Sequence, residues 1–363
     1  MPPRVAYLDT LKALLVAGII FGHAWAGYAE PGSWTYTEVR EVTLAPVTVI
    51  VGEVVFGPFG LFVMGFFFLM AGLLTPRSVA RKGPGRFAGD RLRRLGVPLL
   101  VFTVVLWPPV LYLRDRLAGR TYHPAFDPDH LWFVEVLLLY SLGYAAWRWW
   151  RPVRPVTPTD PGLAAVLALA AGIAGATFLV RLWFPLDSTQ VAELHVWQWP
   201  QCLALFGFGV AAGRRGWLAP VPDGLRRACG RAALVGVAAI GAFAGVVAAR
   251  GVAAEEFYGG WHWAALATAA AEGLLAATVS VWLLGTAQRH LDTPPGPVRS
   301  AANRSAYAAF LLQGHVLIGL ALALRPAHLP AEVKATVVSV VGVVGSFALG
   351  WLLVARSATG RVL

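Results

Sequence analysis

Three ionisable residues lie in the first apolar run of the chain, Leu8 to Tyr28: Asp9 and Lys12 near its start and His23 near its end. Eleven positions separate Lys12 from His23, which on an α-helix is three turns plus about 20°, so the two side chains share one face about 16 Å apart along the axis. An imidazole titrates near neutral pH, so we interpret His23 as a candidate general base. For Asp9 and Lys12, interfacial anchoring is the alternative.

Further candidates occur later in the chain. Arg91 and Arg94 stand one helical turn apart, and guanidinium groups spaced in this way suit phosphate, which they bind through two hydrogen bonds. Anchoring of a helix end to lipid headgroups is the alternative for this pair. His130 begins a predicted helix and Glu135 lies more than a turn inside it. Glu272 stands near the middle of another predicted helix, where it needs a buried partner or a bound proton.

Several recognition motifs are missing. No Walker loop, dinucleotide fingerprint, zinc-ligand spacing or nucleophile elbow occurs in the chain. We therefore expect no metal cofactor.

The elements that must position these residues are predicted to be membrane helices. The chain is 57% hydrophobic and 13% charged, with 15 Trp residues, whereas soluble domains have about 45–50% apolar and about 25% charged residues. Its runs of about 20 apolar residues indicate an all-α integral membrane protein, and we treat 1–363 as one transmembrane domain.

The basic residues predict the orientation of the bundle. With the N-terminus in the cytoplasm, 22 of the 30 Lys and Arg residues fall on the cytoplasmic side, which is the positive-inside pattern. This distribution explains the net charge of +11 through topology and lipid headgroups, and we expect no nucleic-acid partner. We predict both termini in the cytoplasm and ten helices, at about 8–28, 47–74, 95–113, 130–150, 162–184, 197–213, 231–249, 262–286, 302–324 and 335–355.

Four short motifs in order resemble the acyltransferase 3 family of integral membrane acyltransferases. These motifs are Leu8–Lys12 with His23, the aromatic segment Phe66–Gly72, Arg91-x-x-Arg94 before Pro98, and His130–Phe133. With the ten predicted spans included, the resemblance covers nearly the whole chain. The resemblance implies ten membrane helices and transfer of an acyl group, acetyl or another short acyl, from cytoplasmic acyl-CoA to a hydroxyl of a sugar, polysaccharide or related acceptor. It also implies a multi-pass protein of the cell membrane, most typically the bacterial plasma membrane.

One departure from the family pattern concerns a late helix. The family motif, roughly Tyr-x-x-Tyr-Leu-x-His, aligns with Tyr307, Phe310, Leu311 and Gln313, so that Gln313 stands where a His is expected. His315 follows two positions later, which turns a helix by about 200°, so we do not expect it to replace the missing His.

These observations give one assignment of roles. We expect catalytic roles for His23, as base or as transient acyl carrier, and for Asp9, Lys12, His130 and Glu135. Donor phosphates would meet Arg91, Arg94 and Lys12, with acetyl-CoA as the expected donor. Substrate contacts are expected at Trp132, Tyr307, Gln313 and His315.

A second function class also accounts for the buried ionisable groups. A proton-coupled transporter or flippase of a lipid-linked or anionic solute would use His23, Glu272 and His315 as a proton relay. It leaves the arginine pair and His130–Phe133 without a role, and no internal repeat supports it. A structural scaffold would need no deep ionisable residue.

Overall fold

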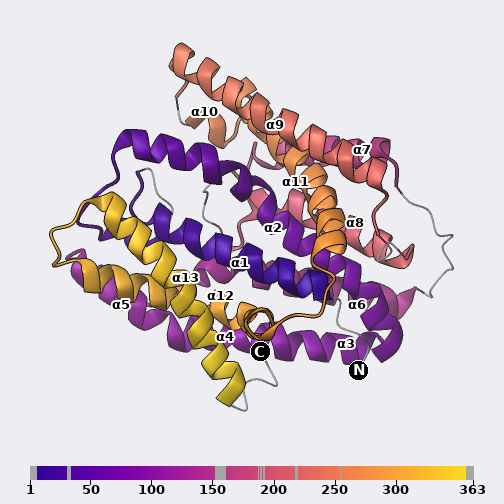
Figure 1. Cartoon of the computed structure of the whole chain (residues 1–363), viewed down its shortest axis with the longest axis horizontal. Coiled ribbons are helices and arrows are strands. Elements are labelled where there is room, and N and C mark those ends of the chain that lie inside the picture. Colours follow the sequence, from indigo (N-terminus) through magenta and orange to yellow (C-terminus); the bar gives the residue numbers. More distant parts are fainter. Residues whose placement is uncertain are drawn as a thin grey trace. The chain divides into compact units, whose positions relative to one another are not determined.

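The computed structural model describes residues 6–30, 34–151, 161–186, 188, 190, 193–216, 220–253 and 255–356. Helices make up 81% of it, and the described residues form no strand. Figure 1 follows the helices in chain order. They are α1 (Ala6–Ala26), α2 (Pro46–Lys82), α3 (Pro84–Arg91), α4 (Val97–Val101), α5 (Pro108–Leu117), α6 (Trp132–Trp150), α7 (Leu163–Val180), α8 (Trp199–Arg214), α9 (Asp223–Arg250), α10 (Glu255–Tyr258), α11 (Trp263–His290), α12 (Pro297–Leu324) and α13 (Ala331–Arg356).

The predicted membrane architecture is confirmed. Among the described residues, eight helices or helical runs are long and apolar enough to cross a membrane. Each of the ten predicted spans overlaps a helix or helical run; those at 130–150 and 197–213 overlap α6 and α8, which are outside the eight. The count of ten therefore stays a prediction, as does the side of the termini, since residues 1–5 and 357–363 lie outside the described part.

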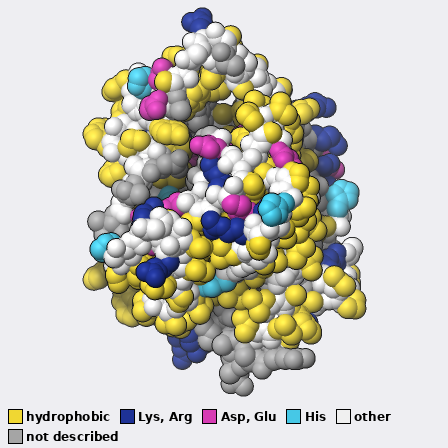
Figure 2. Space-filling view, turned by 90° about the vertical axis from the view of Figure 1, so that its left-hand side faces the viewer, with side chains coloured by type: hydrophobic (Ala, Val, Ile, Leu, Met, Phe, Trp, Pro, Cys, Tyr) yellow, Lys and Arg dark blue, Asp and Glu magenta, His cyan; other side chains and the backbone are white. Residues whose placement is uncertain are grey.

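Several of the described helices expose large apolar side chains, which suits helices that face lipid. Figure 2 shows hydrophobic side chains spread over the displayed face, with charged side chains in small groups between them. Large apolar side chains are exposed on several helices, including Val47 on α2 and Leu234 on α9, which are 71% and 70% exposed.

The chain divides into two compact units. The first unit comprises Met1–Phe56, Val97–Leu131 and Leu291–Leu363, and the second comprises Gly57–Gly96 and Trp132–His290. Each unit is described here by itself.

In the first unit, α1 packs against α12 and α13, and these two helices pack against each other. Small residues permit the close approach: a Cβ at Gly350 of α13 would stand only 2.8 Å from the backbone nitrogen of Ala309 on α12. This packing brings the C-terminal part of α1 next to the middle of α12.

In the second unit, α11 packs against α7 and α9, and α8 packs against α7. Small residues also bring α2 close to α8, because a Cβ at Gly72 of α2 would lie 3.1 Å from the Cα of Gly209 on α8. The α2 helix also continues past its predicted end at residue 74, through Pro76 to Lys82. Pro76 removes one backbone hydrogen bond, yet the chain stays helical on both sides of it.

Candidate active site

His23 lies three residues before the end of α1 and is partly buried. Its ring contacts two side chains, Gln313 and Trp34. Its Nδ1 lies 3.1 Å from Oε1 of Gln313, which is fully buried on α12. The ring also stacks on the indole of Trp34, with centroids 4.4 Å apart and planes 12° from parallel. An amide oxygen only accepts hydrogen bonds, so Nδ1 carries the proton and Nε2 keeps its lone pair. This is the tautomer that a general base or nucleophile needs at Nε2.

A second histidine, His130, stands at the edge of this ring pair. The ring centroids of His130 and His23 are 6.4 Å apart, and Trp34 contacts His130 as well, at 5.6 Å. His130 Nδ1 lies 2.8 Å from Oδ2 of Asp129, and its Nε2 lies 3.2 Å from the carbonyl oxygen of Phe310. Both ring nitrogens are thus held, which fixes the orientation of the imidazole beside His23.

Asp129 is the residue that orients His130. Its Oδ1 accepts a hydrogen bond of 2.8 Å from the hydroxyl of Thr35. Burial by itself raises the pKa of the Asp129 carboxyl, but the hydrogen bonds from His130 and Thr35 outweigh burial and hold the pKa below its ordinary value. Asp129 also has a φ of 44°, in the left-handed region that costs a non-glycine residue about 1–3 kcal/mol. Backbone strain of this kind concentrates at functional sites.

His315 forms no hydrogen bond or ring contact with His23 or Gln313 among the described residues, although it shares the neighbours Phe102 and Trp107 with His130. Its Nε2 lies 2.8 Å from the carbonyl oxygen of Leu106, and its ring packs edge-on against Trp107. This geometry agrees with the predicted rotation between positions 313 and 315. Gly314 stands between Gln313 and His315 in the chain, and its lack of a side chain lets the Trp107 and His130 rings pack against α12. A Cβ there would lie 2.6 Å from the Trp107 ring and 3.3 Å from His130 Cε1.

The remaining predicted residues of the first unit occupy the same helices. Lys12 and Asp9 form the expected pair on α1, with Nζ and Oδ1 3.4 Å apart. Tyr307 lies on α12 before Gln313, and its hydroxyl is buried with no hydrogen-bond partner among the described residues.

The predicted phosphate-binding pair belongs to the second unit. Arg91 ends α3, and its guanidinium lies 5.0 Å from the ring centre of Phe87. Arg94 follows in the π-helical segment 92–96 and is exposed. The arginine between them, Arg93, lies 3.9 Å from Asp90, whereas the described part of the chain gives Arg91 and Arg94 no ion pair. In the described part of the chain, the two motif arginines therefore have no direct ion-pair partner.

Trp132 and Glu135 also belong to the second unit. The Trp132 ring packs on His195 with centroids 4.9 Å apart. The expectation that the helix begins at His130 was wrong: His130 lies in a short 3-10 helix, Asp129–Leu131, and α6 begins at Trp132. Glu135 therefore lies in the first turn of α6, and its Oε2 is buried without a hydrogen-bond partner among the described residues.

Comparison with protein families decides the classification. The model of the acyltransferase 3 family, described as an acyltransferase domain, matches residues 5–355. The chain belongs to this family. This acyltransferase is therefore a multi-pass membrane enzyme that transfers acyl groups other than amino-acyl groups. Comparisons with curated proteins and with solved structures gave no match.

Sequence reasoning missed three residues around the two histidines of this acyltransferase. Asp129, Thr35 and Trp34 received no role, although Asp129 directly precedes His130 in the chain. An acidic residue beside a candidate histidine is a signal that could have been used, because a carboxylate is the usual partner that orients an imidazole. For Thr35 and Trp34, no signal in the sequence links the loop after α1 to His130.

Sequence reasoning also missed the partner of Glu272. Oε2 of Glu272 on α11 lies 2.6 Å from Nη2 of Arg181, which follows α7, and both side chains are 2% exposed. The guanidinium of Arg181 also lies 5.5 Å from the ring centre of Trp197. The predicted need of Glu272 for a buried partner is confirmed, and the pair ties α7 to α11 within the second unit.

In the described part of the chain, no group of three or more His, Cys, Asp or Glu residues is placed to hold a metal ion.

Proposed function

We propose that this acyltransferase moves a short acyl group, acetyl in the simplest case, from cytoplasmic acyl-CoA to a hydroxyl of a sugar, polysaccharide or related acceptor. We place it in a bacterial plasma membrane. The observation that carries the proposal is the hydrogen bond between His23 and Gln313, which leaves Nε2 of a partly buried imidazole as a lone-pair donor. The family assignment favours this reaction over proton-coupled transport.

The reaction follows from that tautomer. His23 Nε2 takes the proton of the acceptor hydroxyl as the hydroxyl oxygen bonds to the thioester carbonyl carbon. The carbon–sulfur bond then breaks, and the leaving CoA thiolate receives the proton from the His23 imidazolium. Acyl carriage by His23, the other role that the family pattern allows, uses the same Nε2 lone pair.

The surrounding residues support this step. The positive charge that develops on His23 strengthens the hydrogen bond from Nδ1 to Gln313, so this contact stabilises the transition state more than the ground state. Trp34 keeps the His23 ring in its plane, and His130, held by Asp129 and by the Phe310 carbonyl, forms a fixed wall beside His23. Within the second unit, Arg91 and Arg94 supply cations for the CoA phosphates, and Lys12 of the first unit is a separate candidate cation. We assign Trp132, Tyr307 and Glu135 to the acceptor and His315 to the support of α12.

Mass spectrometry of cell-surface glycans and small-molecule products tests the proposed acceptor class. Cells with the intact gene should contain an acylated hydroxyl compound that cells without it lack, with a mass difference equal to the acyl group. Identical product profiles in the two strains would contradict the proposed acceptor class.

Gln313 offers a test of the tautomer. Gln313→Leu should lower kcat by about 10–100-fold, because it removes a hydrogen bond to a charged imidazolium worth roughly 1.5–3 kcal/mol. The KM for the donor should stay unchanged. Gln313→Glu, which keeps an acceptor oxygen, should retain more activity than the leucine variant. Equal kcat in the leucine variant and the parent would remove Gln313 from the mechanism.

The arginine pair offers a test of donor binding. The double change Arg91→Ala with Arg94→Ala should weaken CoA affinity about tenfold, which corresponds to roughly 1.4 kcal/mol of binding free energy. This value is modest because Arg94 is exposed and water competes for its hydrogen bonds. The rate of the chemical step at saturating donor should change less. Isothermal titration with CoA measures the affinity.

The matched control for the arginine pair lies on α2. Arg77 and Arg81 are exposed and one helical turn apart, and the described residues give them no ion pair. Their double change to alanine removes the same charge and should leave CoA affinity unaltered. If the two double variants lose affinity equally, Arg91 and Arg94 contribute only net charge.

A further inference from the structure

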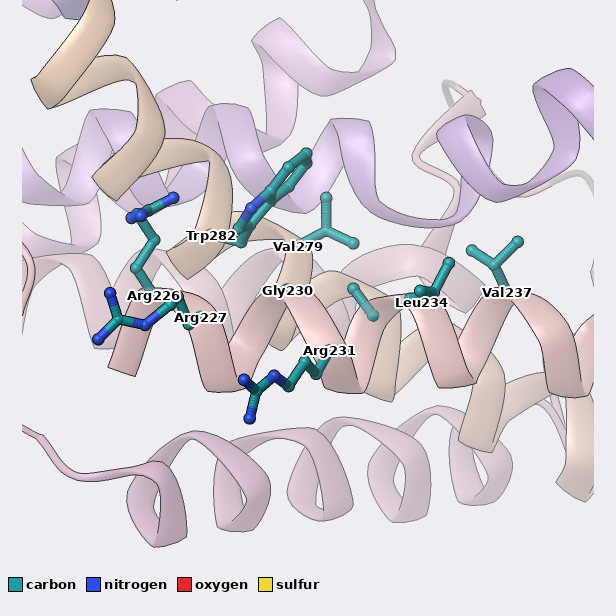
Figure 3. A pocket seen from close by; sticks show the side chains of 9 residues that line it. Arg226, Arg227, Gly230, Arg231, Leu234, Val237, Val279 and Trp282 are labelled. Carbon is teal, nitrogen blue, oxygen red and sulfur yellow. The ribbon is translucent and has the colours of Figure 1, made fainter. Parts of the chain in front are cut away.

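A groove lies along α9 and α11 in the second unit, and none of the residues assigned above lines it. It has a volume of about 560 Å³, within the range of small-molecule sites. Figure 3 shows the residues that line it: Arg226, Arg227, Gly230, Arg231, Ala233, Leu234 and Val237 from α9, and Val279 and Trp282 from α11. The groove is therefore basic near the start of α9 and apolar further along.

The basic end holds more arginines than acidic partners. Arg226 lies 3.2 Å from Asp223, and this carboxylate is shared with Arg289 at 3.1 Å. Arg227 and Arg231 are exposed, stand one helical turn apart, and have no ion pair within the described part of the chain. Two guanidinium groups at this spacing can hold one phosphate between them.

The apolar end runs along the membrane-spanning part of α9. Val237 lies six residues beyond Arg231, about 9 Å further along the helix axis. Only 11% of the most apolar stretch of α9 is buried, so the described part of the protein leaves most of the surface of this helix uncovered. Gly230 lets α9 approach the Trp282 indole of α11 closely, since a Cβ at Gly230 would lie 2.8 Å from that ring.

We propose that this groove binds one anionic phospholipid, with its phosphate between Arg227 and Arg231 and an acyl chain along Leu234, Val237 and Val279. Charge complementarity selects the anionic headgroup, and clusters of Arg at the end of a membrane helix are the usual partners of such lipids. A soluble phosphate compound would leave the apolar wall uncovered, so the lipid fits the whole groove.

Native mass spectrometry of the full chain, with added phosphatidylglycerol or phosphatidylcholine of the same chain lengths, tests this proposal. The parent should retain phosphatidylglycerol in preference to phosphatidylcholine. Arg227→Gln with Arg231→Gln should lower retention of phosphatidylglycerol about tenfold, and Arg77→Gln with Arg81→Gln should leave it unchanged. Both pairs are exposed, so thermal unfolding without added lipid should match the parent in both variants.

Two further arms separate the lipid from other phosphate compounds. Val237→Trp fills the apolar end and keeps both arginines, and it should also lower lipid retention. Glycerol 3-phosphate and CoA should not displace the bound lipid at equal concentration. The proposal is overturned if the arginine variant retains phosphatidylglycerol like the parent, if the parent retains both lipids equally, or if CoA displaces the lipid.

Discussion

Replacement of His23 by alanine should lower kcat by about 10²–10⁴-fold, because a positioned general base contributes a factor of this size. The variant should remain folded and bind CoA like the parent, since His23 is only partly buried and the proposed phosphate contacts are made by other residues. The measurement is the steady-state rate of acyl transfer by purified protein in lipid nanodiscs, together with CoA affinity by titration.

His328→Ala is the matched control for this prediction. His328 belongs to the same unit of the chain and is exposed in the turn between α12 and α13, so its loss should leave kcat unaltered. A structural role for His23 would instead show as reduced yield or stability, with normal activity per folded molecule. A folded His23→Ala protein that transfers acyl groups at the parental rate would exclude this residue from the chemistry.

Breaking the Arg181–Glu272 pair should destabilise the protein by about 3–5 kcal/mol, because either single change leaves a charge buried without its partner. Glu272→Leu and Arg181→Met are the single variants, and thermal unfolding in detergent is the measurement. The midpoint of unfolding should fall in both.

The double variant Arg181→Met with Glu272→Leu supplies the control for this pair. It removes both charges at once, and a buried pair replaced by apolar residues of similar volume is often neutral for stability. The double variant should therefore unfold at a higher temperature than either single variant. Additive losses in the double variant would mean that the two side chains stabilise the fold through separate contacts.

The membrane spans could be predicted because each contains a long apolar run, and in a bilayer such a run must form a helix to satisfy its own backbone. The ends were less predictable. Pro76 reads as a stop signal after the second run, yet α2 continues to Lys82 because one lost hydrogen bond is a small fraction of a 37-residue helix. Likewise, the position of His130 before α6 depends on the 3-10 turn at Asp129–Leu131.

The candidate site could be predicted only residue by residue. The position of His23 within an apolar run marks it without any knowledge of its neighbours. Its contact with Gln313, 290 positions away, depends on how α1 packs against α12, and no local pattern encodes that packing. Arg181 lies near the end of a predicted span, where an arginine is usually an interfacial residue. No pattern in the sequence therefore predicts its ion pair with Glu272.

The release of CoA thiol from acetyl-CoA by the purified parent protein, measured together with the acylated acceptor, tests the proposed reaction most directly. The expected result is one CoA released per acyl group transferred, with release by the His23→Ala protein at the level of the protein-free blank. An acceptor acylated without CoA release, or equal release by the parent and the His23→Ala protein, would contradict acyl-CoA as the donor or His23 as the catalytic residue.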